Sequence, residues 1–306
     1  MLIRTSLPAL AAVVLLAALH GAEPKSAAKP TPIYKTEQPI KIDGVLDDPA
    51  WKRAVPIEAN YIWGKVGQRS KEPRMTAKYT WDDHYLYLGY ETFDKNLVAL
   101  GSGEKKGPKD NERERCLISH PTEKVDVVEF FISFGDEHFF WEVHHNAANH
   151  FSDIFITVAD DSWPASKSSL FRFGINFGFD VLLKDDLDAR RTRAMAVKLK
   201  PKKDGKPSTI NAPGDEDTGY TAELRLPWYG LGAPLARETF VAVEEKGKKK
   251  NVHGPWKMAG QEMMILAVFQ DGDLADHYHH SSPTKPGGWF HKGADLWPKY
   301  VLGSPK

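Results

Sequence analysis

Histidines and aspartates gather in two parts of the sequence, where their spacing could support metal binding or acid–base chemistry. Residues 271–280 hold three aspartates and three histidines. His277 and His279 would share one face of an extended segment, and imidazole and carboxylate groups are ligands for transition metals. No H-E-x-x-H pair accompanies them, so polar loop residues are the simpler interpretation. The second part is residues 144–150, which hold three histidines. His144 and His145 would point to opposite faces if the strand continues through them.

Asp160 and Asp161 are candidates for a different kind of site, because adjacent carboxylates supply the hard oxygen ligands that calcium prefers. The chain has one cysteine, Cys116, and therefore cannot form an internal disulfide. A protein without disulfides gains stability from bound ions. We therefore expect a structural calcium held by loop carboxylates, although other Asp–Asp pairs could serve equally well.

Catalytic motifs are missing from the sequence. Asp126 and Glu129 are three residues apart on a predicted strand and so face opposite sides, unlike the carboxylates that share the cleft of a glycosidase. There is no G-x-S-x-G elbow, phosphate-binding glycine loop or dinucleotide fingerprint. We therefore expect a binding protein without intrinsic catalysis. A hydrolase or lyase that uses loop carboxylates or histidines is the alternative.

The overall composition is that of a folded domain with balanced charge. Of 306 residues, 41 are basic and 41 acidic, which gives a formal net charge of zero. Apolar residues make up 41% of the chain, enough for a substantial core. The absence of a basic surplus argues against nucleic acid as a partner.

The N-terminus has the pattern of a secretory signal peptide in residues 1–22. Arg4 provides the positive charge, and residues 7–19 are apolar apart from one proline but too short to span a bilayer. Gly21 and Ala22 offer a cleavage site. We therefore predict export to the periplasm or the exterior, with no membrane attachment after cleavage. Residues 23–38, rich in Pro, Lys and Ser, predict a flexible N-terminal segment.

Strand signals dominate the rest of the chain. Alternating apolar and polar residues, or short apolar runs, predict strands at residues 75–81, 85–93, 125–134, 138–144, 219–226, 263–269 and 300–302. A short helix is expected near residues 48–54, where a proline follows two aspartates. Charged, Gly- or Pro-containing segments predict loop insertions at residues 101–115, 200–217 and 246–255. These signals indicate an all-β fold. We expect a two-sheet antiparallel β-sandwich, jelly-roll-like, with long loop insertions and little helix, in a single domain at residues 39–303.

Four segments occur in the order found in one protein family. They are IDGVLDDPAWKRA (42–54), YTWDDHYLYL (79–88), DVVEFFI (126–132) and GYTAELRLPW (219–228). Together they resemble a family 9 carbohydrate-binding module, of the DOMON-like sandwich group. The resemblance implies a β-sandwich that binds poly- or oligosaccharide non-covalently. Trp51, in the first segment, is expected to plug one end of the sandwich core.

The resemblance also implies how sugar would be held, between two tryptophans and beside polar groups that bind its hydroxyls. Trp289, in a loop rich in Gly and Pro, matches one of these tryptophans. Glu129 matches a sugar-contacting acid of the family. The resemblance implies that the second tryptophan lies just before Asp126, but this chain has the residues HPTEKV (120–125) there and no aromatic residue among them. The candidates to replace it are Trp63, Trp163 and Tyr278.

Modules of this family are usually joined to glycoside hydrolases. The resemblance therefore implies a role in carbohydrate catabolism, with a separate glycoside hydrolase as partner. Any activity of the chain itself would be hydrolysis of O-glycosyl bonds. DOMON-like sandwiches also bind haem or other redox cofactors, which leaves a redox-cofactor-binding domain as a further alternative. The sequence lacks C-x-x-C-H, but haem held by His and Met does not need this motif.

Overall fold

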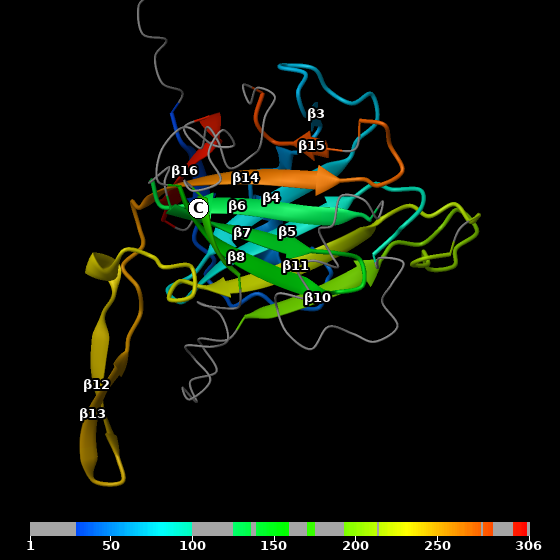
Figure 1. Cartoon of the computed structure of the whole chain (residues 1–306). Coiled ribbons are helices and arrows are strands. Elements are labelled where there is room, and N and C mark those ends of the chain that lie inside the picture. Colours follow the sequence, from blue (N-terminus) through cyan, green and yellow to red (C-terminus); the bar gives the residue numbers. More distant parts are fainter. Residues whose placement is uncertain are drawn as a thin grey trace, which may run out of the picture.

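The computed structural model describes residues 29–99, 125–135, 139–158, 170–174, 193–212, 214–276, 278–283 and 296–304. These residues form two packed β-sheets, a separate hairpin and one short α-helix (Figure 1). The predicted all-β sandwich with little helix is therefore confirmed. Within the described ranges, no helix has the length and apolar character needed to cross a membrane.

The larger sheet has the strand order β1-β16-β14-β6-β7-β8-β9, and β15 pairs with both β14 and β3. Its pairs are antiparallel except one: β1 and β16 run parallel, with Thr31 opposite Tyr300. The expectation of an antiparallel sandwich is wrong for this pair, because strands from opposite ends of the chain are not bound by the direction of a tight turn. The strands are Thr31–Tyr34 (β1), Tyr61–Ile62 (β3), Val127–Ser133 (β6), Phe139–His145 (β7), Phe151–Val158 (β8), Leu170–Gly174 (β9), Glu262–Gln270 (β14), Tyr278–His280 (β15) and Lys299–Gly303 (β16).

The smaller sheet has the order β10-β11-β5-β4-β2. Asp82 makes the turn of its β4–β5 hairpin, because Oδ1 accepts the backbone N–H groups of His84 and Tyr85 at 2.7 and 2.8 Å. This turn joins two of the strands predicted from alternation. The strands are Ile57–Glu58 (β2), Met75–Trp81 (β4), Tyr85–Thr92 (β5), Ala194–Leu199 (β10) and Tyr220–Pro227 (β11).

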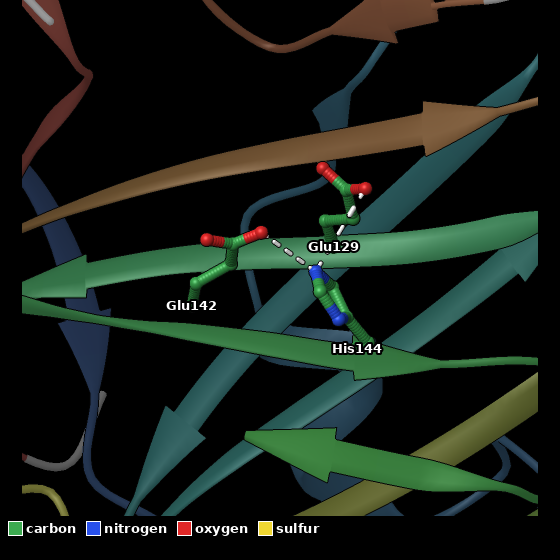
Figure 2. A group of neighbouring side chains, drawn as sticks. All are labelled: Glu129, Glu142 and His144. Atoms are coloured by element: carbon green, nitrogen blue, oxygen red, sulfur yellow. Dashed lines mark hydrogen bonds and ion pairs between the residues drawn. The ribbon is translucent and has the colours of Figure 1, made fainter. Parts of the chain in front are cut away.

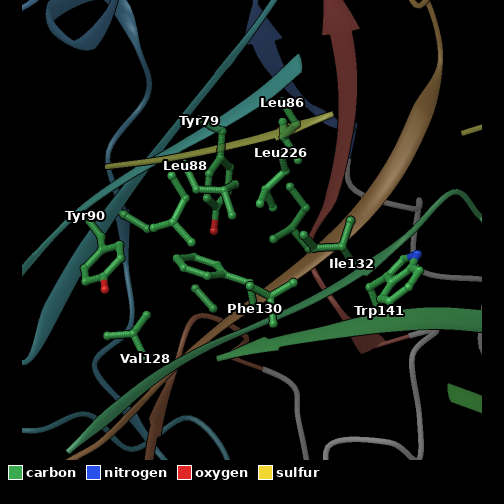
Figure 3. Close-up of a cluster of buried hydrophobic side chains, with 14 of the residues drawn as sticks. Tyr79, Leu86, Leu88, Tyr90, Val128, Phe130, Ile132, Trp141 and Leu226 are labelled. Carbon is green, nitrogen blue, oxygen red and sulfur yellow. The ribbon is translucent and has the colours of Figure 1, made fainter. Parts of the chain in front are cut away.

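The core lies between the two sheets and is filled by alternate side chains of each strand (Figure 3). Phe130 of β6 contacts the rings of Tyr79 and Tyr90 from the opposite sheet, with centroids 6.2 and 5.8 Å apart. Val128 and Ile132 flank it on the same face. Because side chains alternate along a strand, the intervening residues of β6 point to the outer face of the larger sheet.

Helix α1 (Pro49–Arg53) covers the outer face of the smaller sheet rather than an end of the sandwich. Trp51 is fully buried against Tyr87, and its Nε1–H donates to Glu223 Oε1 at 2.7 Å. Gly89 makes room for it, since a Cβ there would stand 3.0 Å from the indole ring. The predicted role of Trp51 as a plug of the core is therefore wrong, because the β5 residues it meets alternate outward.

A hairpin of β12 (Phe240–Glu245) and β13 (Lys248–His253) stands apart from both sheets (Figure 1). Lys246 and Gly247 form its turn with positive φ angles of 51° and 74°, the backbone twist that suits a two-residue hairpin. The prediction of a loop at residues 246–255 is therefore wrong for most of that segment. Residues 200–212 and 214–217 form turns and isolated bridges, as expected, and residues 101–115 lie outside the described part.

Candidate functional site

Glu129, Glu142 and His144 lie side by side on the outer face of the larger sheet, and we call them the outer-face cluster (Figure 2). Glu129 is on β6, and the other two residues are two positions apart on β7. In the strand register, His144 is directly opposite Glu129. Phe130 and Val143, the alternate residues, belong to the core. Strand alternation alone therefore directs the three polar side chains away from the core.

His144 links the two carboxylates of the cluster. Its Nε2 lies 2.8 Å from Glu142 Oε1 and 3.9 Å from Glu129 Oε1. All three residues are buried, with exposed fractions of 6% for Glu129, 7% for Glu142 and 1% for His144. Burial in a medium of low dielectric strengthens such polar contacts and holds the groups in place. The cluster thus presents carboxylate oxygens at fixed positions, where they can accept hydrogen bonds from hydroxyl groups.

Apolar side chains from the same face surround the outer-face cluster. Tyr278 packs against this apolar group from β15. Apolar side chains around a few fixed polar groups are typical of sites for small ligands. The buried members are Phe131, Phe140, Ile156, Met264, Leu266, Val268 and Trp297.

Tyr278 and Trp63 form an aromatic pair beside the cluster. Their ring centroids are 5.8 Å apart in an edge-on arrangement, and the backbone N–H of Trp63 donates to the Tyr278 carbonyl at 3.0 Å. Burial, and then the charges of Glu129 and Glu142, raise the pKa of the Tyr278 phenol, which stays neutral at physiological pH. Trp63 is 38% exposed. The structure therefore brings three of the predicted sugar-contacting residues into one neighbourhood, although their contact with sugar stays a prediction.

The remaining predicted site residues fall into two groups. His279 is described: it pairs with Phe269, a core residue, and so points away from the outer-face cluster. The others lie outside the described residues, so the structure does not test them. They are Trp163 and Trp289 for sugar, and Asp160, Asp161 and His277 for metal.

Sequence reasoning did not select Glu142 and His144 as site residues. His144 and His145 do face opposite sides, as expected, since His145 Nδ1 lies 2.6 Å from the Tyr90 hydroxyl in the core. The sequence signal that could have identified these two residues is the pattern Glu-Val-His at residues 142–144, which places a carboxylate and an imidazole on one strand face. Its link to Glu129 depends on the pairing of β6 with β7, which the pattern does not specify.

Metal-ligating atoms come within 4.8 Å of one another in two groups of three described residues. One is the outer-face cluster, and the other comprises Asp94, Asp126 and Asp271. A surface cavity of about 580 Å³ lies elsewhere, at the base of the β12–β13 hairpin, where Trp81, Phe240 and Trp256 contribute to its lining. None of its lining residues belongs to either group.

Comparison with protein families gives a match over part of the chain. Residues 42–133 match the family described as carbohydrate family 9 binding domain-like. This span runs from the segment before α1 to the last residue of β6 and therefore includes Glu129. A comparison with curated proteins gave no match.

Three solved structures are similar to this one. A family 9 carbohydrate-binding module from Caldicellulosiruptor kristjanssonii was solved in complex with cellotriose (16% identity, TM-score 0.46), covering 90% of this chain and 95% of that one. A structure of such a module from the same organism with glucose gives 15% identity and a TM-score of 0.43, covering 90% and 97%. A candidate carbohydrate-binding protein from Bacteroides uniformis gives 12% identity and a TM-score of 0.50, covering 90% and 100%. The last similarity shows a shared fold.

Proposed function

We propose that this chain, whose residues 42–133 match the carbohydrate family 9 binding domain-like family, binds a poly- or oligosaccharide non-covalently at the outer-face cluster. The observation that supports this proposal most directly is the position of Glu129. Its carboxylate lies on the outer face of the larger sheet, with Glu142 and His144 at its side and Tyr278 close by.

The chemistry of these groups suits a sugar. The C–H face of a pyranose ring stacks on aromatic side chains, and Trp63 and Tyr278 provide such surfaces. Sugar hydroxyls donate to carboxylates in charge-assisted hydrogen bonds, which are stronger than bonds between neutral groups. Because His144 bonds to Glu142 and lies near Glu129, the two carboxylates are held in position before a ligand arrives.

A glycan array identifies a ligand, and titration calorimetry then compares two variants with the native protein. Glu129→Gln removes a charge from the cluster, and we expect affinity to fall about tenfold or more, the loss of one hydrogen bond to a charged group. The control is Glu91→Gln, the same change on the smaller sheet, where Glu91 pairs with Lys200 at 3.0 Å. Equal affinities for the two variants would contradict the proposed site.

Two simple assays separate this proposal from its alternatives. Release of reducing sugar from a polysaccharide panel would indicate a glycoside hydrolase, and new unsaturated products would indicate a lyase. A visible absorption band in the purified protein would indicate haem or another redox cofactor. For a binding protein we expect sugar binding with neither of these signals.

We further propose that the chain is exported and supports a separate glycoside hydrolase in carbohydrate catabolism. The signal-peptide pattern of residues 1–22 supports export, and the family resemblance supports the partnership. Mass spectrometry of the chain expressed with its leader should show cleavage near Gly21–Ala22. An uncleaved chain in the cytosol would overturn the export proposal without affecting sugar binding.

A further inference from the structure

The outer-face cluster brings two acidic groups together with one basic group (Figure 2). Glu129 and Glu142 each supply a carboxylate, and His144 supplies the imidazole. One carboxylate oxygen of each glutamate and a ring nitrogen of His144 lie within 4.8 Å of one another. With both carboxylates ionised, the charges of these three side chains sum to −1 if the imidazole is protonated and to −2 if it is neutral.

His144 uses a small part of the hydrogen-bonding capacity of the two carboxylates. Its Nε2 lies 2.8 Å from Glu142 Oε1, a hydrogen-bond distance, but 3.9 Å from Glu129 Oε1, which is too long for a hydrogen bond. An ionised carboxylate offers about four acceptor positions on its two oxygens. A ligand with several donors can therefore bind both glutamates while His144 stays bonded to Glu142.

The spacing of the two carboxylates suits one ammonium group. The nitrogen of an ammonium lies about 2.8 Å from the carboxylate oxygens to which it donates. Because its N–H groups point to the corners of a tetrahedron, two acceptors of one ammonium stand about 4.6 Å apart. The oxygens of Glu129 and Glu142, within 4.8 Å of each other, are compatible with this separation. A hydroxyl has a single O–H and donates it to one carboxylate at a time.

Burial increases the benefit of a positive charge at this place. Glu129 and Glu142 are 6% and 7% exposed. Two neighbouring carboxylates in such a setting disfavour each other's charged form, and an opposite charge close to both favours it. A neutral sugar offers these groups hydrogen-bond donors alone, whereas an amino sugar offers donors and a positive charge together.

The negative charge of the cluster also reaches its aromatic neighbours. Burial, and then the charges of Glu129 and Glu142, raise the pKa of the Tyr278 phenol, so this ring lies within the field of both carboxylates. Trp63 is its edge-on partner, with ring centroids 5.8 Å apart. Aromatic faces stack on sugar rings and attract cations. Stacking surfaces and charge partners for one cationic sugar therefore lie side by side.

We propose that the outer-face cluster binds an amino sugar, with the ammonium group of the sugar held between Glu129 and Glu142. This inference rests on the proposed sugar site and names the class of its ligand. Glu142 determines the specificity, because a second carboxylate beside Glu129 lets one ammonium donate to both. Trp63 and Tyr278 contact the sugar ring.

The first experiment compares two oligosaccharides of the same linkage and length. Cellotetraose and the fully deacetylated chitosan tetramer share a β-1,4 backbone and differ by an ammonium group in place of one hydroxyl on each unit. Calorimetric titration uses the full chain in a mildly acidic buffer, where the amines are protonated. We expect the chitosan tetramer to bind at least tenfold more tightly, since hydrogen bonds between charged groups are the stronger ones.

The outcomes of this titration separate the inference from the proposed function. Equal affinities, or tighter binding of cellotetraose, would overturn the amino-sugar assignment and leave the sugar site in place. Binding of neither tetramer, nor of any other glycan, would overturn both. The chitin tetramer, whose nitrogens are acetylated and neutral, should bind no more tightly than cellotetraose. Tighter binding of the chitin tetramer would show recognition of the acetamide instead of the charge.

Variants test the role of Glu142. Glu142→Gln keeps an oxygen that can accept the His144 N–H but removes a charge, so we expect the affinity ratio of chitosan tetramer to cellotetraose to fall at least fivefold. The control is Glu262→Gln, an exposed glutamate on the same sheet. It lies six residues along β14 from Val268, the strand partner of Glu129, or about 20 Å away. An unchanged ratio in Glu142→Gln would contradict the assignment.

A metal ion is the competing cation for two carboxylates and an imidazole, and the same titrations test it. They are repeated on the native chain after treatment with EDTA, and we expect the affinity for the chitosan tetramer to be unchanged. If EDTA abolishes binding and zinc or calcium chloride restores it, the cluster holds a metal ion instead of an ammonium group, and the inference is wrong.

Discussion

Two adjacent histidines of β7 have opposite surroundings. His144 lies among carboxylates on the outer face, whereas His145 is fully buried in the core. His145 Nδ1 lies 2.6 Å from the Tyr90 hydroxyl, and Nε2 lies 2.9 Å from Asn149 Oδ1. Since the amide oxygen can only accept, we assign the proton to Nε2 and infer that Tyr90 donates to Nδ1.

Burial lowers the pKa of His145 to about 4, and this predicts a specific pH dependence of stability. In the unfolded chain this histidine takes up a proton near pH 6.5, whereas in the folded chain it does so only near pH 4. Stability is therefore highest above the unfolded pKa and is lost as the pH falls toward 4. Between pH 7.5 and 5, the free energy of unfolding should fall by about 2 kcal/mol more in the native protein than in His145→Gln.

Urea unfolding at the two pH values measures this difference. His150→Gln is the control, because it changes a nearby histidine that is not in the core. Identical pH dependence in His145→Gln and the native protein would show that His145 does not remain neutral in the folded state.

Trp289 is the sugar-contacting tryptophan predicted from the sequence, and it lies outside the described residues. We expect Trp289→Ala to reduce carbohydrate affinity about fivefold or more, because stacking on an indole contributes on the order of 1 kcal/mol or more. The melting temperature should stay nearly unchanged. Calorimetric titration and thermal melting measure the two effects, with Phe240→Ala as control, since Phe240 is 58% exposed on the hairpin. A large drop in melting temperature would indicate instead that Trp289 is part of the core.

At the scale of elements, the indole of Trp51 anchors helix α1 to the smaller sheet. Glu223 of β11 accepts the Nε1–H of Trp51 through one oxygen and the backbone N–H of Gly44 through the other, at 2.7 and 2.8 Å. Trp51→Phe would leave a buried carboxylate oxygen without this donor. We expect the free energy of unfolding in urea to fall by about 1–3 kcal/mol.

The same substitution elsewhere is the control for this measurement. Trp63→Phe changes an indole that is 38% exposed, and it should have little effect on stability. If Trp51→Phe is equally harmless, the indole–carboxylate bond does not anchor α1.

The β12–β13 hairpin is an element that the sandwich should tolerate losing. Val241 and Val252 are directly opposite each other in the ribbon, so an Asn-Gly turn can join them after removal of residues 242–251. We expect the melting temperature to change by no more than about 2 °C and carbohydrate affinity to remain native, because the outer part of the hairpin stands apart from the sheets (Figure 1). A fall in affinity would place the ligand near the hairpin.

The strands that sequence patterns predicted are those with one face in the core. Residues 75–81 alternate regularly and form β4 with the same bounds. The strands that were not predicted are β1, β2, β3, β8, β9, β10, β12 and β15. The prediction of a flexible segment at residues 23–38 is wrong for β1, which pairs with β16 in the larger sheet. β10 (AMAVKL) and β12 (FVAVEE) each begin with four apolar residues instead of alternating, and such a short run does not distinguish a strand from a helix. The lysine-rich β13 was predicted as loop because its pairing depends on the turn at Lys246 and Gly247 rather than on burial.

At the scale of the whole molecule, the candidate sites depend on which strands become neighbours. The family resemblance selected Glu129, but its approach to Glu142 and His144 follows from the pairing of β6 with β7. Tyr278 joins them through β15, which pairs with the end of β14. The three aspartates come together through both sheets. Local patterns predict strands, whereas long-range pairing decides which polar side chains meet.

The most direct test of the central claim is a crystal structure of the mature protein with the best ligand from a glycan array. We predict that the sugar lies on the outer face of the larger sheet, with a hydroxyl within hydrogen-bond distance of Glu129 and a ring against Tyr278 or Trp63. A sugar bound elsewhere, for example in the cavity at the base of the hairpin beside Phe240 and Trp256, with Glu129 free of contact, would contradict the account.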